Sequence, residues 1–238
     1  MRDIFHVHTY RCGHAEKVSD EQYICKARDM GANAITFTDH APFPGDLFKN
    51  RMKKEELDEY ISTLKDLRIQ YKNEIEVKIG LEIEYLPSYQ NYYQELFKNR
   101  DIDILMIGQH FYEVEPGKYS FEFPELQEQE YKGCLKAVIE GMNTGLFQVV
   151  AHPDRAFRRI EKWNSDCANI SKQVIDVALT NSVFLEQNLS SQRHKNYYRS
   201  EFWDLLTQDN KIIKGFDAHS IKDLDADIIK YSFRKNVR

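Results

Sequence analysis

Seven short apolar runs, rich in β-branched residues, recur along the chain and alternate with longer polar segments. The runs cover residues 3–8, 33–39, 76–83, 103–108, 147–151, 182–187 and 211–217. The segments between them carry apolar residues at helical spacing, which predicts helices near residues 19–30, 53–71, 89–98, 124–143, 166–180 and 197–208. Gly31, Gly141 and Gly145 fall where those helices are expected to stop. The alternation favours a parallel sheet with crossover helices.

Seven strand–helix units predict an incomplete or distorted relative of the eight-unit β/α barrel, although an open doubly wound sheet would give a similar string. The two folds differ in where the polar strand ends meet, at one mouth in a barrel and around a switch point in an open sheet. Polar residues follow most of the predicted strands, which favours the barrel. No linker or change in composition divides the chain, so residues 1–238 are expected to form a single domain.

Seven of the eight histidines lie at or just beyond the ends of predicted strands, together with two carboxylates. These nine positions are His6, His8, His14, His40, Glu82, His110, His152, Asp217 and His219. Side chains two apart on a regular strand share a face, so His6 and His8 can hold one ion. One such pair is weak support, but the whole set indicates a metal centre with nitrogen and oxygen ligands. Zn, Mn or Fe suits that chemistry.

Charge and cysteine content limit the remaining classes of function. The formal net charge of −5 argues against an extended nucleic-acid surface, which usually depends on clustered Lys and Arg. No apolar run is long enough to span a bilayer, and the first residues lack the layout of a signal peptide. Cys12, Cys25, Cys134 and Cys167 form no C-x-x-C pair, so reduced thiols are expected. We expect a cytoplasmic chain without a membrane partner, and its oligomeric state is left open.

Three ordered motifs are specific enough to support a resemblance. They are Thr-Asp-His-Ala-Pro-Phe-Pro at residues 38–44, Gly-Leu-Glu-Ile-Glu-Tyr at 80–85 and Gly-Gln-His-Phe at 108–111. With the other histidines, over residues 6–219, they resemble the polymerase and histidinol phosphatase (PHP) family of metal-dependent phosphoesterases. Within the family the similarity is greatest to the histidinol-phosphate phosphatases. The resemblance implies a distorted seven-stranded β/α barrel of the PHP type with three divalent transition-metal ions. It also implies hydrolysis of a small phosphomonoester, L-histidinol phosphate, in histidine biosynthesis.

The resemblance also implies which residues hold each ion. It assigns one ion to His6, His8, Glu82 and Asp217, a second to His14, His40 and His219, and a third to Glu82, His110 and His152. Glu82 would then bridge two ions, a role open to a carboxylate because it has two oxygens. Catalytic roles are implied for Glu82, Asp217, His40 and Arg193.

Other residues near these positions are candidates for substrate binding or for orienting the ligands. Arg193, Arg158 and Arg155 are candidate phosphate-binding residues, because guanidinium presents a bidentate donor fork. Asp39 and Asp154 neighbour proposed ligands and are candidates to accept the second N–H of a histidine ring, although Asp154 also suits a loop or capping role. Glu84 is expected to be solvated or to support a ligand.

Several other functions remain open. A PHP phosphoesterase acting on another small phosphomonoester or on a nucleotide is the nearest alternative. A metal-dependent amidohydrolase also uses an H-x-H strand, but no strand-end lysine is present where a bridging ligand is wanted. A non-catalytic metal-binding protein would be expected to have lost some of the ligands, and none of the nine positions is lost. A cluster of divalent ions favours a phosphate monoester as substrate.

Overall fold

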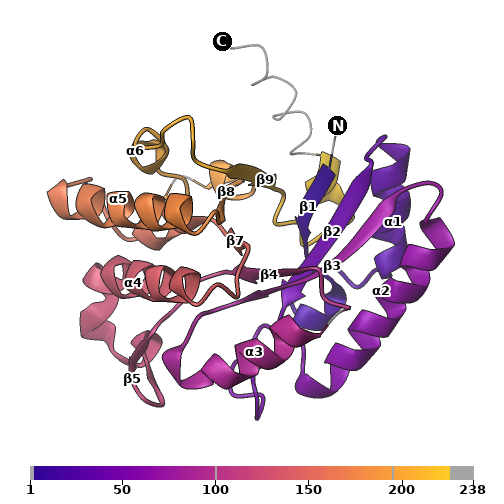
Figure 1. Ribbon diagram of the computed structural model, residues 1–238, viewed down its shortest axis with the longest axis horizontal. Coiled ribbons are helices and arrows are strands. Elements are labelled where there is room, and N and C mark those ends of the chain that lie inside the picture. The colour runs from indigo at the N-terminus through magenta and orange to yellow at the C-terminus, as the bar shows by residue number, and fades with distance from the viewer. Residues whose placement is uncertain (1–2, 100, 195, 226–238) are drawn as a thin grey trace. The chain divides into compact units, whose positions relative to one another are not determined.

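The computed structural model describes residues 3–99, 101–194 and 196–225 (Figure 1). The chain divides into two compact units that are each built from separate stretches of sequence. Unit 1 comprises Met1–Glu82, Arg100–Ile104 and Lys214–Arg238, and unit 2 comprises Ile83–Asn99 and Leu105–Ile213. The expectation of a single domain stays a prediction.

The described residues of unit 1 form three parallel strands in the order β1-β2-β3 and two α-helices. The elements are β1 (Asp3–Val7), α1 (Asp20–Asp29), β2 (Ala34–His40), α2 (Leu57–Tyr71) and β3 (Glu76–Ile83). Every residue of β2 is buried, as expected for a parallel strand covered on both faces. The segment that follows β9 (Ile212–Gly215) runs beside β1, where the His8 amide donates to the Ala218 carbonyl at 2.9 Å.

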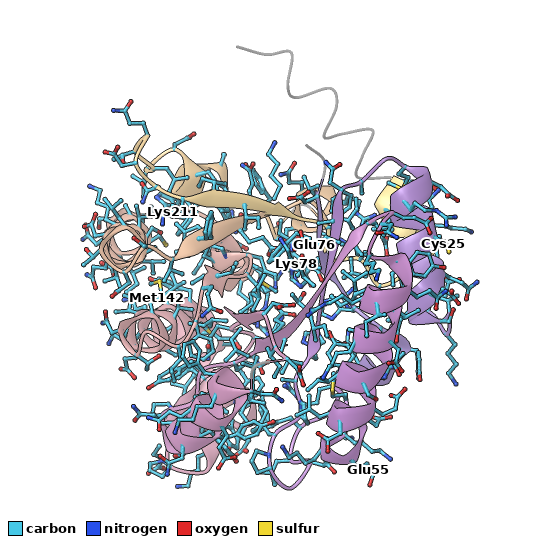
Figure 2. All side chains as sticks on the ribbon, turned by 45° about the vertical axis from the view of Figure 1, so that its right-hand side comes forward. Cys25, Glu55, Glu76, Lys78, Met142 and Lys211 are labelled. Atoms are coloured by element: carbon cyan, nitrogen blue, oxygen red, sulfur yellow. The ribbon has the colours of Figure 1, made fainter. Side chains whose placement is uncertain are left out.

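Unit 2 contains a second set of parallel strands, in the order β4-β7-β8, and four helices. The elements are β4 (Ile104–Ile107), α3 (Gln90–Lys98), α4 (Glu130–Asn143), β7 (Val149–Val150), α5 (Ser165–Thr180), β8 (Phe184–Asn188) and α6 (Ser200–Trp203). Helices α4 and α5 pack against each other. Side chains cover both units densely, with Met142 of α4 fully buried (Figure 2).

All seven predicted strands are present, but some boundaries and one helix differ from the sequence expectation. The helix expected at 197–208 is reduced to Ser200–Trp203. After it, the side chain of Asn210 accepts the Thr207 amide at 2.9 Å, and such local bonds compete with helix. Residues 124–129, expected to open the fourth helix, form a 3₁₀ turn that starts at Pro124. Gly141 lies inside α4 rather than at its end, against Ile107 and Tyr85.

A short antiparallel hairpin was not predicted. Its strands are β5 (Glu113–Glu115) and β6 (Lys118–Tyr119). Gly117 occupies the turn with φ 76°, and its amide donates to the Glu113 side chain at 3.0 Å. Strands of two and three residues are too short to produce a readable alternation of apolar residues. Over the described ranges no helix has the length and apolar character needed to cross a membrane.

Candidate metal centre

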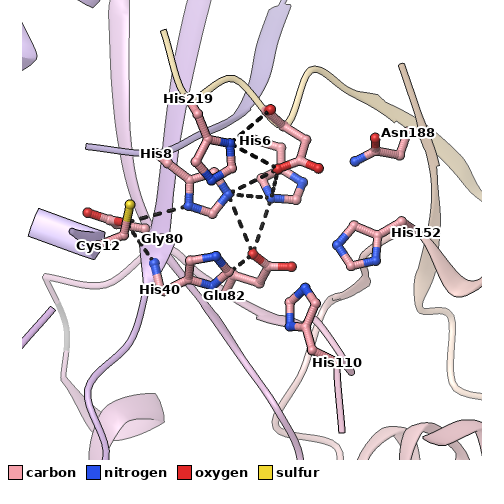
Figure 3. A network of polar contacts seen from close by, with 12 residues as sticks. His6, His8, Cys12, His40, Gly80, Glu82, His110, His152, Asn188 and His219 are labelled. Atoms are coloured by element: carbon pink, nitrogen blue, oxygen red, sulfur yellow. Dashed lines mark hydrogen bonds and ion pairs between the residues drawn. The ribbon is translucent and has the colours of Figure 1, made fainter. Parts of the chain in front are cut away.

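Histidines from several strand ends of unit 1 converge on one buried cluster (Figure 3). His6 and His8 of the first strand run are both fully buried, and their Nε2 atoms lie 3.0 Å apart. Regular alternation does not produce this arrangement, because the register of β1 against β2 shifts between Phe5 and Val7. His6 itself has φ 69°. The convergence of the two rings therefore rests on an irregular strand with a left-handed residue.

Two carboxylates complete the first predicted ligand set. Glu82, 1% exposed at the end of β3, places Oε2 3.3 Å from His6 Nε2 and 3.5 Å from His8 Nε2. Asp217 places Oδ1 3.3 Å from His8 Nε2 and 3.6 Å from His6 Nε2. Asp217 is also left-handed, with φ 53°. The structure thus brings together His6, His8, Glu82 and Asp217, the set that the resemblance assigns to one ion, and their binding of that ion stays a prediction.

The second predicted set, His14, His40 and His219, joins the same cluster. The ring of His14 lies 4.6 Å from that of His219 and 5.4 Å from that of His40, measured between centroids. His40 Nδ1 also lies 3.2 Å from Glu82 Oε2. The donor atoms of His8, His40 and His219 form a closer group than those of the second predicted set. His8 therefore lies beside the donor atoms of both predicted sets.

Cys12 is the one thiol near these ligands. Its sulfur groups with nitrogens of His14 and His219 within ligand-binding range. The side chain is fully buried, and burial raises the pKa of the thiol to about 12. The predicted ligand sets, made of nitrogen and oxygen donors, do not include Cys12.

The electrostatics and the donor set suit a divalent cation. Burial lowers the pKa of His8, but the carboxylates of Asp217 and Asp39 outweigh it and raise that pKa to about 9. Burial, with neighbouring His8, lowers the pKa of His219 to about 3. Within the described part of the chain, buried His219 Nε2 has no hydrogen-bond partner. An unprotonated imidazole nitrogen without a hydrogen bond can donate its lone pair to a transition-metal ion.

A buried chain of polar contacts supports His8 from behind. Asp39 is fully buried, with Oδ1 3.5 Å from His8 Nδ1, and it accepts the His40 amide at 2.8 Å. The Thr9 hydroxyl donates to Asp39 Oδ2, and Arg11 Nη1 donates to Thr9 Oγ1 at 3.2 Å. Asp39 was identified from the sequence, whereas Thr9 and Arg11 belong to no recognisable motif and were missed.

Unit 2 carries the two remaining predicted ligands, His110 after β4 and His152 after β7. Their ring centroids lie 5.2 Å apart. Glu84 is 1% exposed and lies 3.0 Å from His110 Nδ1, so it supports this histidine rather than facing solvent. The His152 amide donates to Glu186 Oε2 at 3.0 Å. The third predicted set takes Glu82 from unit 1 and these two histidines from unit 2, and it stays a prediction.

The three candidate arginines lie in unit 2 and are partly buried. Arg155 donates to Ser191 Oγ at 2.7 Å, and Arg193 donates to Ser190 Oγ at 3.2 Å. Arg158 donates to the Glu130 carboxylate at 2.8 Å. These contacts do not test the expected role of the three arginines in substrate binding, which stays a prediction.

Asp154, the other candidate to orient a histidine, is fully buried. It accepts the Arg199 amide and Trp203 Nε1, both at 2.9 Å, and so ties the segment after β7 to α6. Burial raises the pKa of this carboxyl to about 7. These contacts agree with the loop role, which was one of the two roles expected for Asp154 from the sequence.

Comparisons with known proteins add the family and the fold. The PHP domain family matches residues 5–190. A probable histidinol-phosphatase of Deinococcus radiodurans is 30% identical over 158 residues, 63% of this chain and 59% of that relative. The alignment therefore spans less than two thirds of the length of the Deinococcus radiodurans relative. A histidinol-phosphatase of Bacillus subtilis is 22% identical over 252 residues, covering 92% of this chain and 94% of that relative.

Two solved structures resemble the chain along nearly its whole length. A putative histidinol phosphatase from Listeria monocytogenes has a TM-score of 0.79 at 16% identity, covering 97% of this chain and 100% of its own. The histidinol phosphate phosphatase of Lactococcus lactis, solved with zinc, L-histidinol and phosphate, has a TM-score of 0.71 at 18% identity, covering 96% and 93%. These likenesses confirm the predicted fold class, a distorted seven-stranded β/α barrel of the PHP type.

Proposed function

The chain belongs to the PHP domain family, and on that premise we propose that it is a metal-dependent phosphatase that hydrolyses L-histidinol phosphate to L-histidinol and phosphate. The observation that carries the proposal is the buried cluster in which His6 and His8 lie 3.0 Å apart and each lies 3.3–3.6 Å from an oxygen of Glu82 and an oxygen of Asp217. The names of the Deinococcus radiodurans and Bacillus subtilis relatives support the substrate. The proposed setting is histidine biosynthesis in the cytoplasm.

The proposed cofactors are three divalent transition-metal ions, with the three predicted ligand sets as their sites. Zinc is supported by the Lactococcus lactis structure, and the donor chemistry also suits Mn or Fe. When bound, such ions polarise the phosphoryl oxygens and activate water for in-line attack.

The chain's own residues have two tasks in this proposal. Imidazoles and carboxylates bind the ions, and Asp39 and Glu84 hold His8 and His110 in fixed orientations so that the ligands need little rearrangement. Arg193 is proposed to bind the phosphate dianion through its guanidinium fork. Glu82, Asp217 and His40 are proposed to act on the reaction through the ions that they hold.

Phosphate release tests this proposal directly. The metal-free chain would be reconstituted separately with Zn, Mn and Fe and offered L-histidinol phosphate, an aryl phosphate, nucleotides and short DNA. We expect kcat/KM for L-histidinol phosphate to exceed that for the aryl phosphate by at least about tenfold, or ~1.4 kcal/mol of transition-state stabilisation. The Glu82→Ala variant is the control for contaminating phosphatase, because it removes a ligand and should lower turnover sharply.

The other outcomes separate the alternatives. Hydrolysis confined to other phosphomonoesters or nucleotides would keep the phosphoesterase and reject the substrate. Silence with every metal would reject the phosphatase and favour an amidohydrolase or a non-catalytic metal-binding protein.

A further inference from the structure

His152 holds an unfavourable backbone conformation. Its φ of 31° and ψ of 56° lie in the left-handed region, which is unfavourable for a residue with a β-carbon. The residue is 3% exposed. It opens the 3₁₀ turn Pro153–Phe157 directly after β7, so its backbone sets the direction in which the imidazole leaves the strand. Contacts from the surrounding structure must stabilise this conformation.

The main contact comes from a buried carboxylate on the neighbouring strand. Glu186 of β8 is fully buried, and its Oε2 accepts the His152 amide at 3.0 Å. The same oxygen accepts Asn188 Nδ2 at 3.2 Å. Because a buried amide without an acceptor is costly, this hydrogen bond favours the left-handed conformation over one that turns the amide away.

Further contacts fix the position of the Glu186 carboxylate. Asn188 Oδ1 accepts the Ser191 amide at 2.7 Å and Arg155 Nη2 at 3.2 Å. Arg155 lies in the 3₁₀ turn that follows His152, and its backbone amide donates to the His152 carbonyl at 2.9 Å. The contacts therefore form a closed loop from His152 through Glu186, Asn188 and Arg155 back to His152.

We infer that Glu186 is a positioning residue for His152, holding its backbone so that the imidazole is set for metal binding before an ion arrives. The inference rests on the proposed function only in taking His152 as a ligand. A carboxylate that merely joined β8 to the turn would stabilise the fold without affecting the affinity for any ion.

Two substitutions of similar shape separate these roles. Glu186→Met fills the same space but accepts no hydrogen bond, whereas Glu186→Gln keeps an oxygen acceptor. Zn would be titrated into each metal-free variant against a chromophoric chelator. We expect Glu186→Met to weaken the binding of one ion by about 10–100-fold, as loss of a residue that orients a ligand typically does. Glu186→Gln should restore most of that affinity.

Gln148→Ala is the matched control at the other end of β7. The Gln148 side chain also accepts a backbone amide, that of Leu105 at 2.8 Å. Its loss should lower thermal stability while every ion keeps its affinity. Unchanged zinc affinity in Glu186→Met, with a stability loss like that of Gln148→Ala, would overturn the inference.

A second measurement uses the unaltered chain and so does not depend on a variant that folds. Hydrogen exchange at the His152 amide would be followed in the metal-free protein. Protection before metal is added is the expected result, and rapid exchange that slows only with zinc would contradict positioning in advance. Neither readout involves turnover, so a failure to hydrolyse L-histidinol phosphate would count against the proposed function alone.

Discussion

The hydroxyl of Thr9 controls the orientation of the carboxylate behind His8. The Arg11 amide and guanidinium both donate to the Thr9 oxygen, at 3.4 and 3.2 Å, so the single hydroxyl proton is directed to Asp39. We predict that Thr9→Val, which keeps the shape and removes the hydroxyl, lowers zinc affinity by about 10–100-fold. Thr9→Ser should restore it. Chelator competition on the metal-free protein would measure both changes.

Thr38→Val provides the control for the chemistry of this substitution. Thr38 is also fully buried in unit 1, but its Oγ1 has no hydrogen-bond partner among the residues described. The same change there removes no hydrogen bond, so zinc affinity should be unaltered. Equal losses in Thr9→Val and Thr38→Val would show that a general packing defect, and not the contact with Asp39, weakens the site.

The nine candidate ligand positions could be selected from the sequence because histidines and carboxylates recur at the ends of predicted strands, and their roles as ligands stay a prediction. Thr9 and Glu186 could not, because each acts through a partner that only the fold brings near, at sequence separations of 30 and 34. The left-handed backbones of His6, His152 and Asp217 were also hidden, since glycine usually marks such positions and none is present there. These strained residues occur among the predicted ligands, where strain is often concentrated.

At the scale of elements, a buried guanidinium joins the turn after β1 to two helices. Arg11 binds Asp20 at the start of α1 at 2.9 Å and Glu59 of α2 at 2.7 Å. The side chains of Arg11 and Asp20 are each 2% exposed, whereas that of Glu59 is 53% exposed. Arg11→Met would leave the Asp20 charge buried without its cation, which costs about 3–5 kcal/mol of unfolding free energy. Urea unfolding at pH 7 would measure this loss.

The loss should depend on pH in a defined direction. Burial raises the pKa of Asp20 and Arg11 opposes that rise, so removing Arg11 raises the pKa further. The folded variant then binds a proton more readily than the unfolded chain, and its deficit shrinks as pH falls towards 4. The double variant Arg11→Met/Asp20→Asn should recover most of the stability at pH 7. A deficit of equal size at both pH values, compared in metal-free proteins, would contradict the buried-charge account.

Gly80 allows the neighbouring backbone of unit 1 to lie close to β3. A β-carbon added there would lie 2.9 Å from the Phe37 carbonyl oxygen and 3.1 Å from that of Ile104, and neither backbone can move freely. We predict that Gly80→Ala lowers the unfolding free energy by about 1–3 kcal/mol, as overpacking of a core does. Lys78→Ala, on the same strand beside Glu76, should change stability by less than about 0.5 kcal/mol (Figure 2). A neutral Gly80→Ala in thermal unfolding would refute the clash.

The helices with a long, periodic pattern were predictable, whereas the short helix α6 and the β5–β6 hairpin were not. The apolar face of α2, from Leu57 to Tyr71, repeats over several turns and ends where the helix predicted at 53–71 ends, while Lys54–Glu56 form a 3₁₀ turn before it. In α6 the pattern competes with the turn made by Thr207 and Asn210, and the local side-chain contacts end the helix. The β5–β6 hairpin is held by a single glycine turn and the Glu113 side chain, which leaves no periodic signal.

At the scale of the whole chain, the barrel class followed from seven repeated strand–helix units, but the division into two compact units did not. Each unit is assembled from separate stretches of sequence, so no linker or change of composition marks a boundary. Unit 1 contains seven of the nine predicted ligands, and unit 2 contains His110 and His152. Loss of metal is therefore expected to affect unit 1 most strongly.

Removal of metal should lower the stability of the protein, with the largest effect at the strand ends of unit 1. The buried rings and carboxylates of His6, His8, Glu82 and Asp217 share a small volume, and a bound cation stabilises only the folded arrangement. At an ion concentration of 100 Kd the expected gain is about 2.7 kcal/mol. Thermal unfolding with and without chelator measures it, and hydrogen exchange locates it. Zn should restore the midpoint and Mg or Ca should not, because imidazole-rich sites suit transition metals. Equal restoration by Mg, or an unchanged chelator effect in Glu82→Ala, would show that the stabilising ion binds elsewhere.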